Sequence, residues 1–294
     1  MTPIDRSIII FDSINKRYWL QVILSVMDQY GANDPIKEIS ISFYKSIKQE
    51  DLSPFHIVTL ACLIQYLDDN LYTVFLKKEN ENVYHFIMKD LLFREYWGGK
   101  KNYVDTSISN DIFNLWRIKN EEKDFYAQRV AEFFKKEYFQ NKDLSSLSTS
   151  LSEAFYNVFD HAQAGNNAFS FIKYDKNRQK IAVGICDFGI GIVNSVRNHI
   201  PNIGNDKKAL EKSIEVNFTI ASTEHNRGWG LENILNNSDI VRIFSGEAVL
   251  IKVGEKKKVL GTNIKFPGTL IYLEVDILKL EDNDSVIDDF DIWS

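Results

Sequence analysis

Cysteine, long apolar runs and clustered positive charge are all scarce in this sequence. Only Cys62 and Cys186 occur among 294 residues, each inside an apolar segment. This favours small buried side chains in a reducing compartment over a disulfide framework. No stretch approaches the roughly 20 apolar residues that a membrane span requires, and the first residues do not form a charged-then-apolar signal sequence. We therefore expect a cytoplasmic protein without a membrane span.

The charge distribution argues against nucleic acid as the main ligand. The formal net charge is −6, whereas binding to a phosphate backbone requires a clustered positive surface. The short basic run at 256–258 is better interpreted as a solvated hairpin turn. Cysteine and histidine do not occur at the spacing of a structural zinc site.

The length of 294 residues is sufficient for two domains with separate cores. We expect an α/β protein of the α+β class. A small α/β regulatory or interaction domain is expected at 1–120, a two-layer sandwich at 121–280 and an acidic tail at 281–294. The tail is expected to be flexible, although its composition would also suit a basic groove, including one in a neighbouring molecule. Its apolar residues are Val286, Ile287, Phe290, Ile292 and Trp293.

The N-terminal half shows a pattern of alternating strands and helices. Residues 36–43 alternate apolar and polar side chains like a half-buried strand. Ser53 followed by Pro54 predicts a helix start, with a serine N-cap and proline at the first helical position. Residues 73–76 predict another strand and residues 82–96 another helix. This order indicates a small α/β domain.

The same pattern resembles the STAS domains, in which a similar strand precedes a serine-initiated helix. That resemblance implies a phosphoacceptor hydroxyl at the start of the helix, but Pro54 occupies the aligned position. Ser53 lies one residue away and is explained by capping. We therefore expect a domain that contacts partners or the other half of the chain. A generic α/β domain without this kinship is an equal alternative.

Residues 121–139 have helical periodicity and connect the two halves. Their apolar positions predict a helix that packs on the sheet of the second domain, with Glu and Lys on the other face. A helix that forms a dimer is the alternative. The apolar positions are Phe125, Val130, Phe133, Phe134 and Tyr138.

The segment at 144–162 predicts an amphipathic helix, because its apolar side chains recur at three- and four-residue steps. Glu153, Asn157 and His161 are spaced by four residues, which places them one turn apart on a stripe opposite the apolar row. An amide oxygen is a hard ligand suited to magnesium, and a carboxylate one turn earlier can orient or deprotonate a nucleophile. A solvated polar face is the alternative. The apolar positions are Leu144, Leu147, Leu151, Phe155, Val158 and Ala162.

A second motif begins where the apolar run at 180–186 ends. This run predicts a buried strand, and Asp187 follows it, with glycines at 189 and 191. Glycine permits positive φ and a close approach of the backbone to a ligand, and a carboxylate at a strand end can accept a hydrogen bond from an exocyclic amine. A strand leading into an ordinary glycine turn is the alternative. The Asp-Phe-Gly triplet does not indicate a classical protein kinase, since the His-Arg-Asp loop is absent.

A third motif places Gly228 and Gly230 directly before a predicted short helix at 231–235. A glycine loop that opens a helix directs backbone N–H groups and the positive end of the helix dipole towards an anion. Arg227 can add a charge-assisted contact to phosphate oxygens. The sequence has no Gly-x-x-x-x-Gly-Lys-Ser/Thr, so this is not a P-loop nucleotide site.

Together the three motifs resemble the N, G1 and G2 boxes of the GHKL ATP-binding superfamily. That superfamily includes DNA gyrase, the large heat-shock chaperone, histidine kinases, mismatch-repair ATPases and anti-sigma-factor serine kinases. The motifs are Glu153-Ala-Phe-Tyr-Asn157-Val-Phe-Asp160-His161, Asp187-Phe-Gly189-Ile-Gly191-Ile192 and Asn226-Arg227-Gly228-Trp229-Gly230-Leu231. The resemblance covers residues 143–276, about half the chain, and implies a Bergerat-type domain that binds ATP with magnesium.

The resemblance also implies roles for individual residues. Asn157 would be the magnesium ligand, Glu153 the general base and Asp187 the group that reads the adenine amino group. Thr269, in a Gly-Thr pair before an apolar strand, would support the adenine contact. The remaining nucleotide contacts would be Asp160, His161, Gly189, Gly191, Ile192, Arg227, Gly228, Trp229, Gly230 and Leu231.

The region between the second and third motifs, at 194–226, is long and polar and has a helical stretch at 206–218. In the superfamily the equivalent region is a mobile lid over the nucleotide, and such lids commonly gate the chemistry.

Three functions from different classes remain open. The first is slow ATP hydrolysis that drives a conformational switch, with Glu153 orienting water. The second is a serine/threonine protein kinase of the anti-sigma type that acts on a separate partner. The Glu-x-x-x-Asn-x-x-x-His arrangement is closest to that branch. The third is a nucleotide-sensing interaction module without chemistry, against which the carboxylate at 153 argues. A protein partner is expected in addition to ATP, and a homodimer is an open alternative.

Overall fold

The computed structural model describes residues 7–33, 35, 37–98, 109, 111–161, 168–215 and 230–282. Within them the chain is mixed α and β, with one parallel and one antiparallel sheet. This content agrees with the expected α+β class.

The N-terminal part contains a three-stranded parallel sheet in the order β1-β2-β3. Helices α1 and α2 lie in the two connections between these strands. The structure confirms the predicted strand at 73–76, the predicted start of helix α2 and most of the predicted strand at 36–43. The sequence did not predict β1 or α1. The elements are β1 (Ile8–Phe11), α1 (Lys16–Gln29), β2 (Glu38–Phe43), the 3₁₀ turn η1 (Gln49–Asp51), α2 (Pro54–Asp69) and β3 (Thr73–Leu76).

Ser53 acts as the cap of α2, as its sequence context predicts. Its backbone N–H donates to His56 Nδ1 at 3.0 Å, and its hydroxyl lies 3.0 Å from the same nitrogen. The other ring nitrogen of His56 lies 3.0 Å from the carbonyl oxygen of Ile14. Burial of the ring lowers the pKa of His56 to about 4, so the side chain is neutral at physiological pH and serves the helix start.

The single helix predicted at 82–96 is wrong, because the structure breaks this segment into three pieces. Leu92 has a φ of 46°, which an α-helix does not tolerate. The Leu91 carbonyl accepts a hydrogen bond from Asn114 Nδ2 at 2.8 Å. A tertiary contact with strand β4 therefore replaces helical continuation. The pieces are α3 (Glu81–His85), the π-helical turn η2 (Phe86–Asp90) and α4 (Phe93–Trp97).

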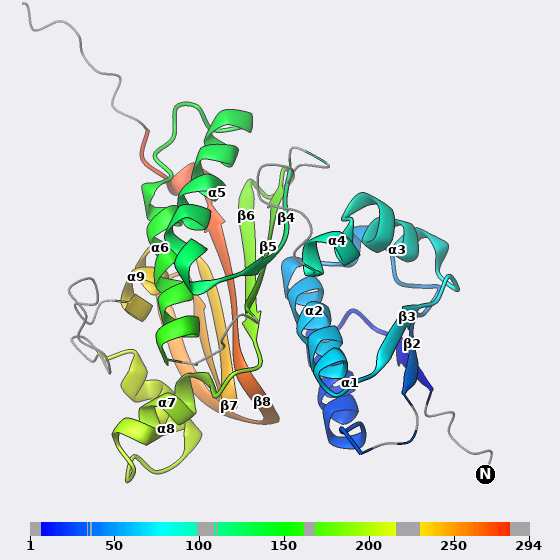
Figure 1. Cartoon of the computed structure of the whole chain (residues 1–294). Coiled ribbons are helices and arrows are strands. Elements are labelled where there is room, and N and C mark those ends of the chain that lie inside the picture. The colour runs from blue at the N-terminus through cyan, green and yellow to red at the C-terminus, as the bar shows by residue number, and fades with distance from the viewer. Residues whose placement is uncertain are drawn as a thin grey trace, which may run out of the picture.

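The second part contains a five-stranded antiparallel sheet in the order β4-β5-β6-β8-β7. Helices α5 and α6 cover one face of this sheet (Figure 1). The strands are β4 (Ile112–Ile118), β5 (Ala168–Asp175), β6 (Lys180–Asp187), β7 (Ile240–Val253) and β8 (Lys256–Asp276). The helices are α5 (Lys123–Glu137), α6 (Ser145–Tyr156), α7 (Gly191–His199), α8 (Asp206–Ser213) and α9 (Gly230–Asn236), with 3₁₀ turns η4 (Asn120–Glu122) and η6 (Ile277–Lys279). The sequence did not predict strand β4.

The apolar pattern predicted at 144–162 is confirmed at the positions that the structure describes. Five of the six predicted core residues are buried, and the sixth, Ala162, lies outside the described residues. The buried five are Leu144, Leu147, Leu151, Phe155 and Val158. Helix α5 packs against α6 and β4, but its buried face includes Tyr126, while Phe125 is 47% exposed. The prediction that Phe125 belongs to the packed face is therefore wrong.

Helix α2 lies between the two sheets and packs on the face of the antiparallel sheet opposite α5 and α6 (Figure 1). Almost all of its side chains are buried, and the buried apolar residues of both halves form one continuous cluster. The two halves therefore share one core, whereas the sequence had suggested separate cores. Both cysteines lie in this core, and neither forms a disulfide.

Gly184 in β6 is the closest approach between α2 and the antiparallel sheet. A Cβ atom added there would lie 2.7 Å from the Pro54 carbonyl oxygen. Because backbone atoms cannot move aside, we expect Gly184→Ala to lower the unfolding free energy by roughly 2 kcal/mol. The matched control is Gly261→Ala in β8, where the nearest atom is 4.0 Å away. Urea denaturation should show little change for the control, and equal stability of the two variants would contradict the close packing of α2 on β6.

The long β7–β8 hairpin is strongly bent. Gly246 in β7 has a φ of 56°, and the Gly254 N–H donates to the Asp239 carbonyl at 2.9 Å. The end of β7 therefore returns to its beginning. Residues 256–258 are exposed as expected, but they begin strand β8, and the turn itself lies at 254–255.

The first residues of the predicted acidic tail are held in place. The Asp143 N–H donates to the Glu281 carbonyl at 2.9 Å, and Lys142 forms an ion pair of 2.8 Å with Asp282. The expectation of a flexible tail is wrong for these two residues, and residues 283–294 lie outside the described part.

Candidate functional site

Asp187 occupies the last position of β6, and its direct neighbour across the sheet is Thr269 in β8. Both residues are fully buried. Asp187 Oδ1 accepts a hydrogen bond of 2.7 Å from the Gly189 N–H. Among the described residues, neither Asp187 Oδ2 nor Thr269 Oγ1 forms a hydrogen bond of standard geometry, although Thr269 lies close enough to act on the Asp187 carboxyl as a donor. The fold therefore places a buried carboxylate and a buried hydroxyl side by side at one strand end, where a ligand group can donate a hydrogen bond to the carboxylate oxygen.

Burial raises the pKa of Asp187 to about 7, although hydrogen bonds from the Gly189 N–H and from the backbone and hydroxyl of Thr269 oppose this effect. A carboxylate in this environment weakens the folded state whenever it is ionised. Groups with strongly shifted pKa values of this kind are concentrated at functional sites.

The glycines around Asp187 allow the backbone segments to touch. A Cβ atom at Gly268 would lie 2.7 Å from Asp187 Oδ1, and one at Gly191 would lie 2.6 Å from Ser245 Oγ. Gly191 also has a φ of 77°, which disfavours any side chain. The Ser245 hydroxyl accepts a hydrogen bond of 3.2 Å from the Val193 N–H. This packing fixes the start of α7 against β7 and β8.

Asn157 lies at the junction between α6 and a π-helical turn, η5 (Asn157–His161). The side chain is 8% exposed, and its Nδ2 donates to the Glu153 carbonyl at 2.7 Å. This hydrogen bond uses the nitrogen end of the carboxamide and leaves the oxygen as the end available to a ligand. The predicted stacking of His161 one α-helical turn beyond Asn157 is wrong, because a π-turn contains more residues than an α-turn.

Glu153 has one satisfied and one unsatisfied oxygen. Its Oε1 accepts a hydrogen bond of 3.4 Å from Asn233 Nδ2, on helix α9. Its Oε2 is buried and has no partner among the described residues. Burial raises the pKa of Glu153; the Asn233 hydrogen bond opposes this and the Asp124 charge adds to it. These features suit a carboxylate that accepts a proton.

Asn233 is a site residue that the sequence motifs did not identify. It lies two residues after Leu231 in a helix whose apolar positions Leu231, Ile234 and Leu235 are buried. Helix α9 packs against α6, which brings Asn233 to Glu153. Its position two residues after Leu231, the last residue of the third motif, was the only sign of it in the sequence. The packing of α9 on α6 is what makes Glu153 its partner.

The start of α7 connects the two groups of residues. Helix α7 contacts η5, which begins at Asn157. It also begins at Gly191, which is packed against Gly268. Ile192 and Leu231 are buried. Gly230 is the first residue of α9. Arg227, Gly228, Trp229 and the side chains of Asp160 and His161 lie outside the described residues.

The predicted helical stretch at 206–218 corresponds to α8 (Asp206–Ser213), and residues 216–226 of the predicted lid lie outside the described part. Asp206 forms an ion pair with Arg197 and accepts a hydrogen bond of 2.6 Å from the Glu247 N–H. These contacts attach the N-terminus of α8 to α7 and to the bend of β7.

Among the described residues, no group of three or more His, Cys, Asp and Glu side chains is placed to hold a metal ion. No helix in the described part of the chain is long and apolar enough to cross a membrane.

No protein-family model matches the sequence, and no curated protein matches it significantly.

Proposed function

We propose that this chain binds ATP with magnesium in a GHKL-type site and acts as a slow ATPase conformational switch. The five-stranded antiparallel sheet and its helices would form the Bergerat-type domain, and the part before β4 the STAS-like regulatory domain. The boundary expected between residues 120 and 121 is therefore moved to precede β4 (Ile112–Ile118), which pairs with β5. The observation that carries the proposal is the fully buried Asp187 at the end of β6, whose Oδ2 forms no hydrogen bond of standard geometry among the described residues.

An adenine base would supply the hydrogen-bond donor that Asp187 lacks. Its exocyclic amine can donate to Oδ2, while Oδ1 stays with the Gly189 N–H. A guanine base has a carbonyl oxygen at the corresponding position, which would face the carboxylate without a proton. A buried polar group that is left unpaired costs about 1–3 kcal/mol. The site therefore favours ATP over GTP.

The donor set around Asn157 fits magnesium better than a metal held by protein alone. The described residues offer no cluster of three acidic or histidine ligands, whereas magnesium usually takes one or two protein oxygens and completes its shell with phosphates and water. The Asn157 carboxamide oxygen is suited to this role, because its nitrogen is held by the Glu153 carbonyl. Bound magnesium would neutralise phosphate charge.

Glu153 is the proposed general base. Its unsatisfied Oε2 can accept a proton from water, and Asn233 holds the other oxygen. A serine/threonine kinase activity on a separate protein is the second candidate, since the same oxygen can accept the proton of a serine hydroxyl. Ser53 is not a convincing acceptor within the chain, because it is occupied with capping α2 through His56.

Replacing Glu153 should separate binding from chemistry. We expect Glu153→Ala and Glu153→Gln to retain ATP and to lose turnover by about 100-fold or more, the usual size of a general-base contribution. In the wild type, turnover should rise with pH through the raised pKa of Glu153, since only the ionised carboxylate accepts a proton. Steady-state phosphate release between pH 4.5 and 8.5 measures this. Retained turnover in Glu153→Gln would remove Glu153 from this role.

The function as a whole is tested by incubating the purified chain with magnesium and γ-labelled ATP. Free phosphate and label on protein are followed together. Phosphate release that Glu153→Ala abolishes would support the ATPase switch. ATP retention without release or labelling would favour the kinase that lacks its substrate, or a nucleotide sensor. Failure to retain ATP would overturn the proposal.

A further inference from the structure

A groove of about 820 Å³ lies between the start of α1 and the bent β7–β8 hairpin. The hairpin supplies one wall because β7 returns on itself at Gly246. The groove is separate from Asp187, Glu153 and Asn157, none of which lines it. Its apolar lining residues are Leu20, Phe244, Val249, Ile251, Leu260 and Ile264.

The charged residues that line this groove are all basic. They are Lys16, Arg17 and Arg242, and among the described residues none of them forms an ion pair with a carboxylate. Lys16 Nζ lies 4.1 Å from the centre of the Tyr272 ring, and the Arg242 guanidinium carbon lies 6.0 Å from the same centre. Two cations therefore share one aromatic ring.

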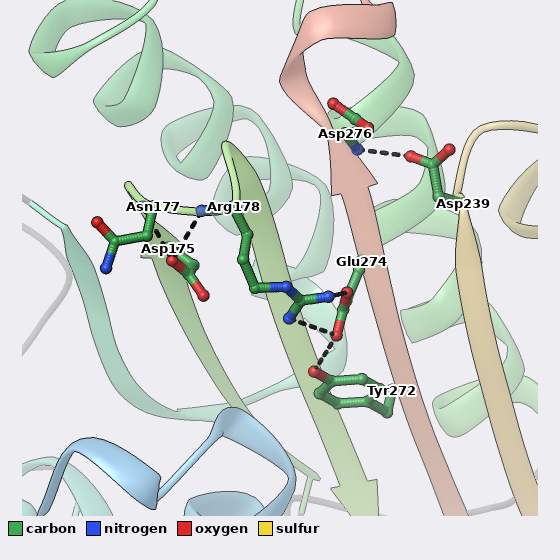
Figure 2. A network of polar contacts seen from close by, with 7 residues as sticks. All are labelled: Asp175, Asn177, Arg178, Asp239, Tyr272, Glu274 and Asp276. Carbon is green, nitrogen blue, oxygen red and sulfur yellow. Dashed lines mark hydrogen bonds and ion pairs between the residues drawn. The ribbon is translucent and has the colours of Figure 1, made fainter.

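The carboxylate next to Tyr272 is already engaged elsewhere. Glu274 accepts hydrogen bonds of 2.6 Å from Arg178 and 2.7 Å from the Tyr272 hydroxyl, as Figure 2 shows. Burial and the nearby Arg242 charge lower the pKa of Lys16 to about 8, despite the opposing charge of Glu274. A partly buried cation beside another cation is destabilised, so an anionic group in the groove would relieve both charges.

We propose that residues 283–294 of the same molecule occupy this groove. The segment has four aspartates and no lysine or arginine, and it alternates these acids with large apolar side chains. It thus matches the basic and apolar lining of the groove. The acids are Asp284, Asp288, Asp289 and Asp291, and the apolar residues are Val286, Ile287, Phe290, Ile292 and Trp293.

The segment can reach the groove within one molecule. Lys279, four residues before it, forms an ion pair with Asp239, and Figure 2 shows Asp239 joined to the end of β8 through the Asp276 N–H. Arg242 lies three residues further along β7, about 10 Å at the usual rise of a strand. Twelve extended residues span up to about 40 Å, several times the length of the β7 segment between Asp239 and Arg242.

The test is a competition measured on full-length chains with a fluorescently labelled peptide of residues 283–294. In the tail variant, asparagine replaces the four aspartates, so that its own segment no longer competes. We expect the peptide to bind the tail variant at least tenfold more tightly than the wild-type chain. Adding Lys16→Gln and Arg242→Gln to the tail variant should weaken binding at least tenfold. Adding Lys119→Gln and Lys136→Gln, two exposed lysines near or on α5, removes equal charge and should change nothing.

Three results would overturn the proposal. Equal binding of the peptide to the wild type and the tail variant would mean that the segment does not occupy the groove in its own molecule. Equal effects of the two pairs of substitutions would mean that the groove is not the site. Concentration-dependent dimers that only the wild type forms would indicate docking in a second copy. If the variant with Lys16→Gln and Arg242→Gln melts at a lower temperature, a charge reversal replaces it. The tail variant with Lys16→Glu and Arg242→Glu should then bind a peptide that carries lysines in place of the aspartates.

Discussion

Asp187→Asn should make the protein more stable at pH 8 and at the same time weaken ATP binding. The pKa of Asp187 rises on folding from its ordinary value of 3.8 to about 7 because the carboxyl is buried. The folded state then binds a proton that the unfolded state has released, so the unfolding free energy falls as pH rises between about 4 and 7. One pKa unit corresponds to about 1.4 kcal/mol. The neutral amide removes this loss, and we expect a gain of roughly 2–4 kcal/mol at pH 8.

Denaturation at several pH values would measure this effect. The gain should shrink towards pH 4, where the wild-type carboxyl is protonated in both states. The control is Asp206→Asn, in which a carboxylate that pairs with Arg197 and accepts the Glu247 N–H is neutralised. That substitution should lower stability at pH 8. A loss of stability in Asp187→Asn would contradict the unsatisfied environment of its carboxylate.

The same substitution should weaken ATP binding at least 100-fold, because an amide nitrogen facing the exocyclic amine would place two hydrogen-bond donors together. Any remaining binding should discriminate less against GTP. Isothermal titration with ATP and GTP measures both effects. If Asp187 had only a structural role, its replacement would not raise the stability of the protein and weaken ATP binding together. The two measurements therefore separate a ligand-binding role from a structural role. Intact GTP discrimination would show that Asp187 does not read the base.

Asn157→Ala should abolish the magnesium dependence of ATP binding. The substitution removes the proposed oxygen ligand of magnesium and also the hydrogen bond to the Glu153 carbonyl. We expect at least 100-fold weaker ATP binding with magnesium, or about 2.7 kcal/mol. With a chelator present, the variant and the wild type should bind equally weakly.

The matched control is Asn157→Asp, which keeps an oxygen in place but removes the donor to Glu153. It should bind ATP with magnesium more tightly than the alanine variant does. Circular dichroism and thermal melting show whether α6 is intact in each variant. Unchanged ATP affinity of Asn157→Ala in magnesium would remove Asn157 as the ligand.

Local sequence predicts the elements in which one physical rule dominates. The helix α6 follows from its three- and four-residue apolar steps, and β6 from its apolar run before Asp187. The start of α2 follows from Ser53 and Pro54. Prediction failed where tertiary contacts override local preference. Leu92 takes a left-handed conformation as Asn114 binds the adjacent carbonyl, and α5 buries Tyr126 in place of the neighbouring Phe125.

The sequence by itself determined which residue types stand at the ends of strands and on the polar face of α6, because spacing along the chain is enough for that. Only the tertiary structure decided that Thr269 lies beside Asp187 and that Asn233 holds Glu153. These pairs join residues 80 or more positions apart, so strand register and helix packing bring them together. Burial, which leaves Asp187 and Glu153 each with an unsatisfied oxygen, is a property of the whole fold.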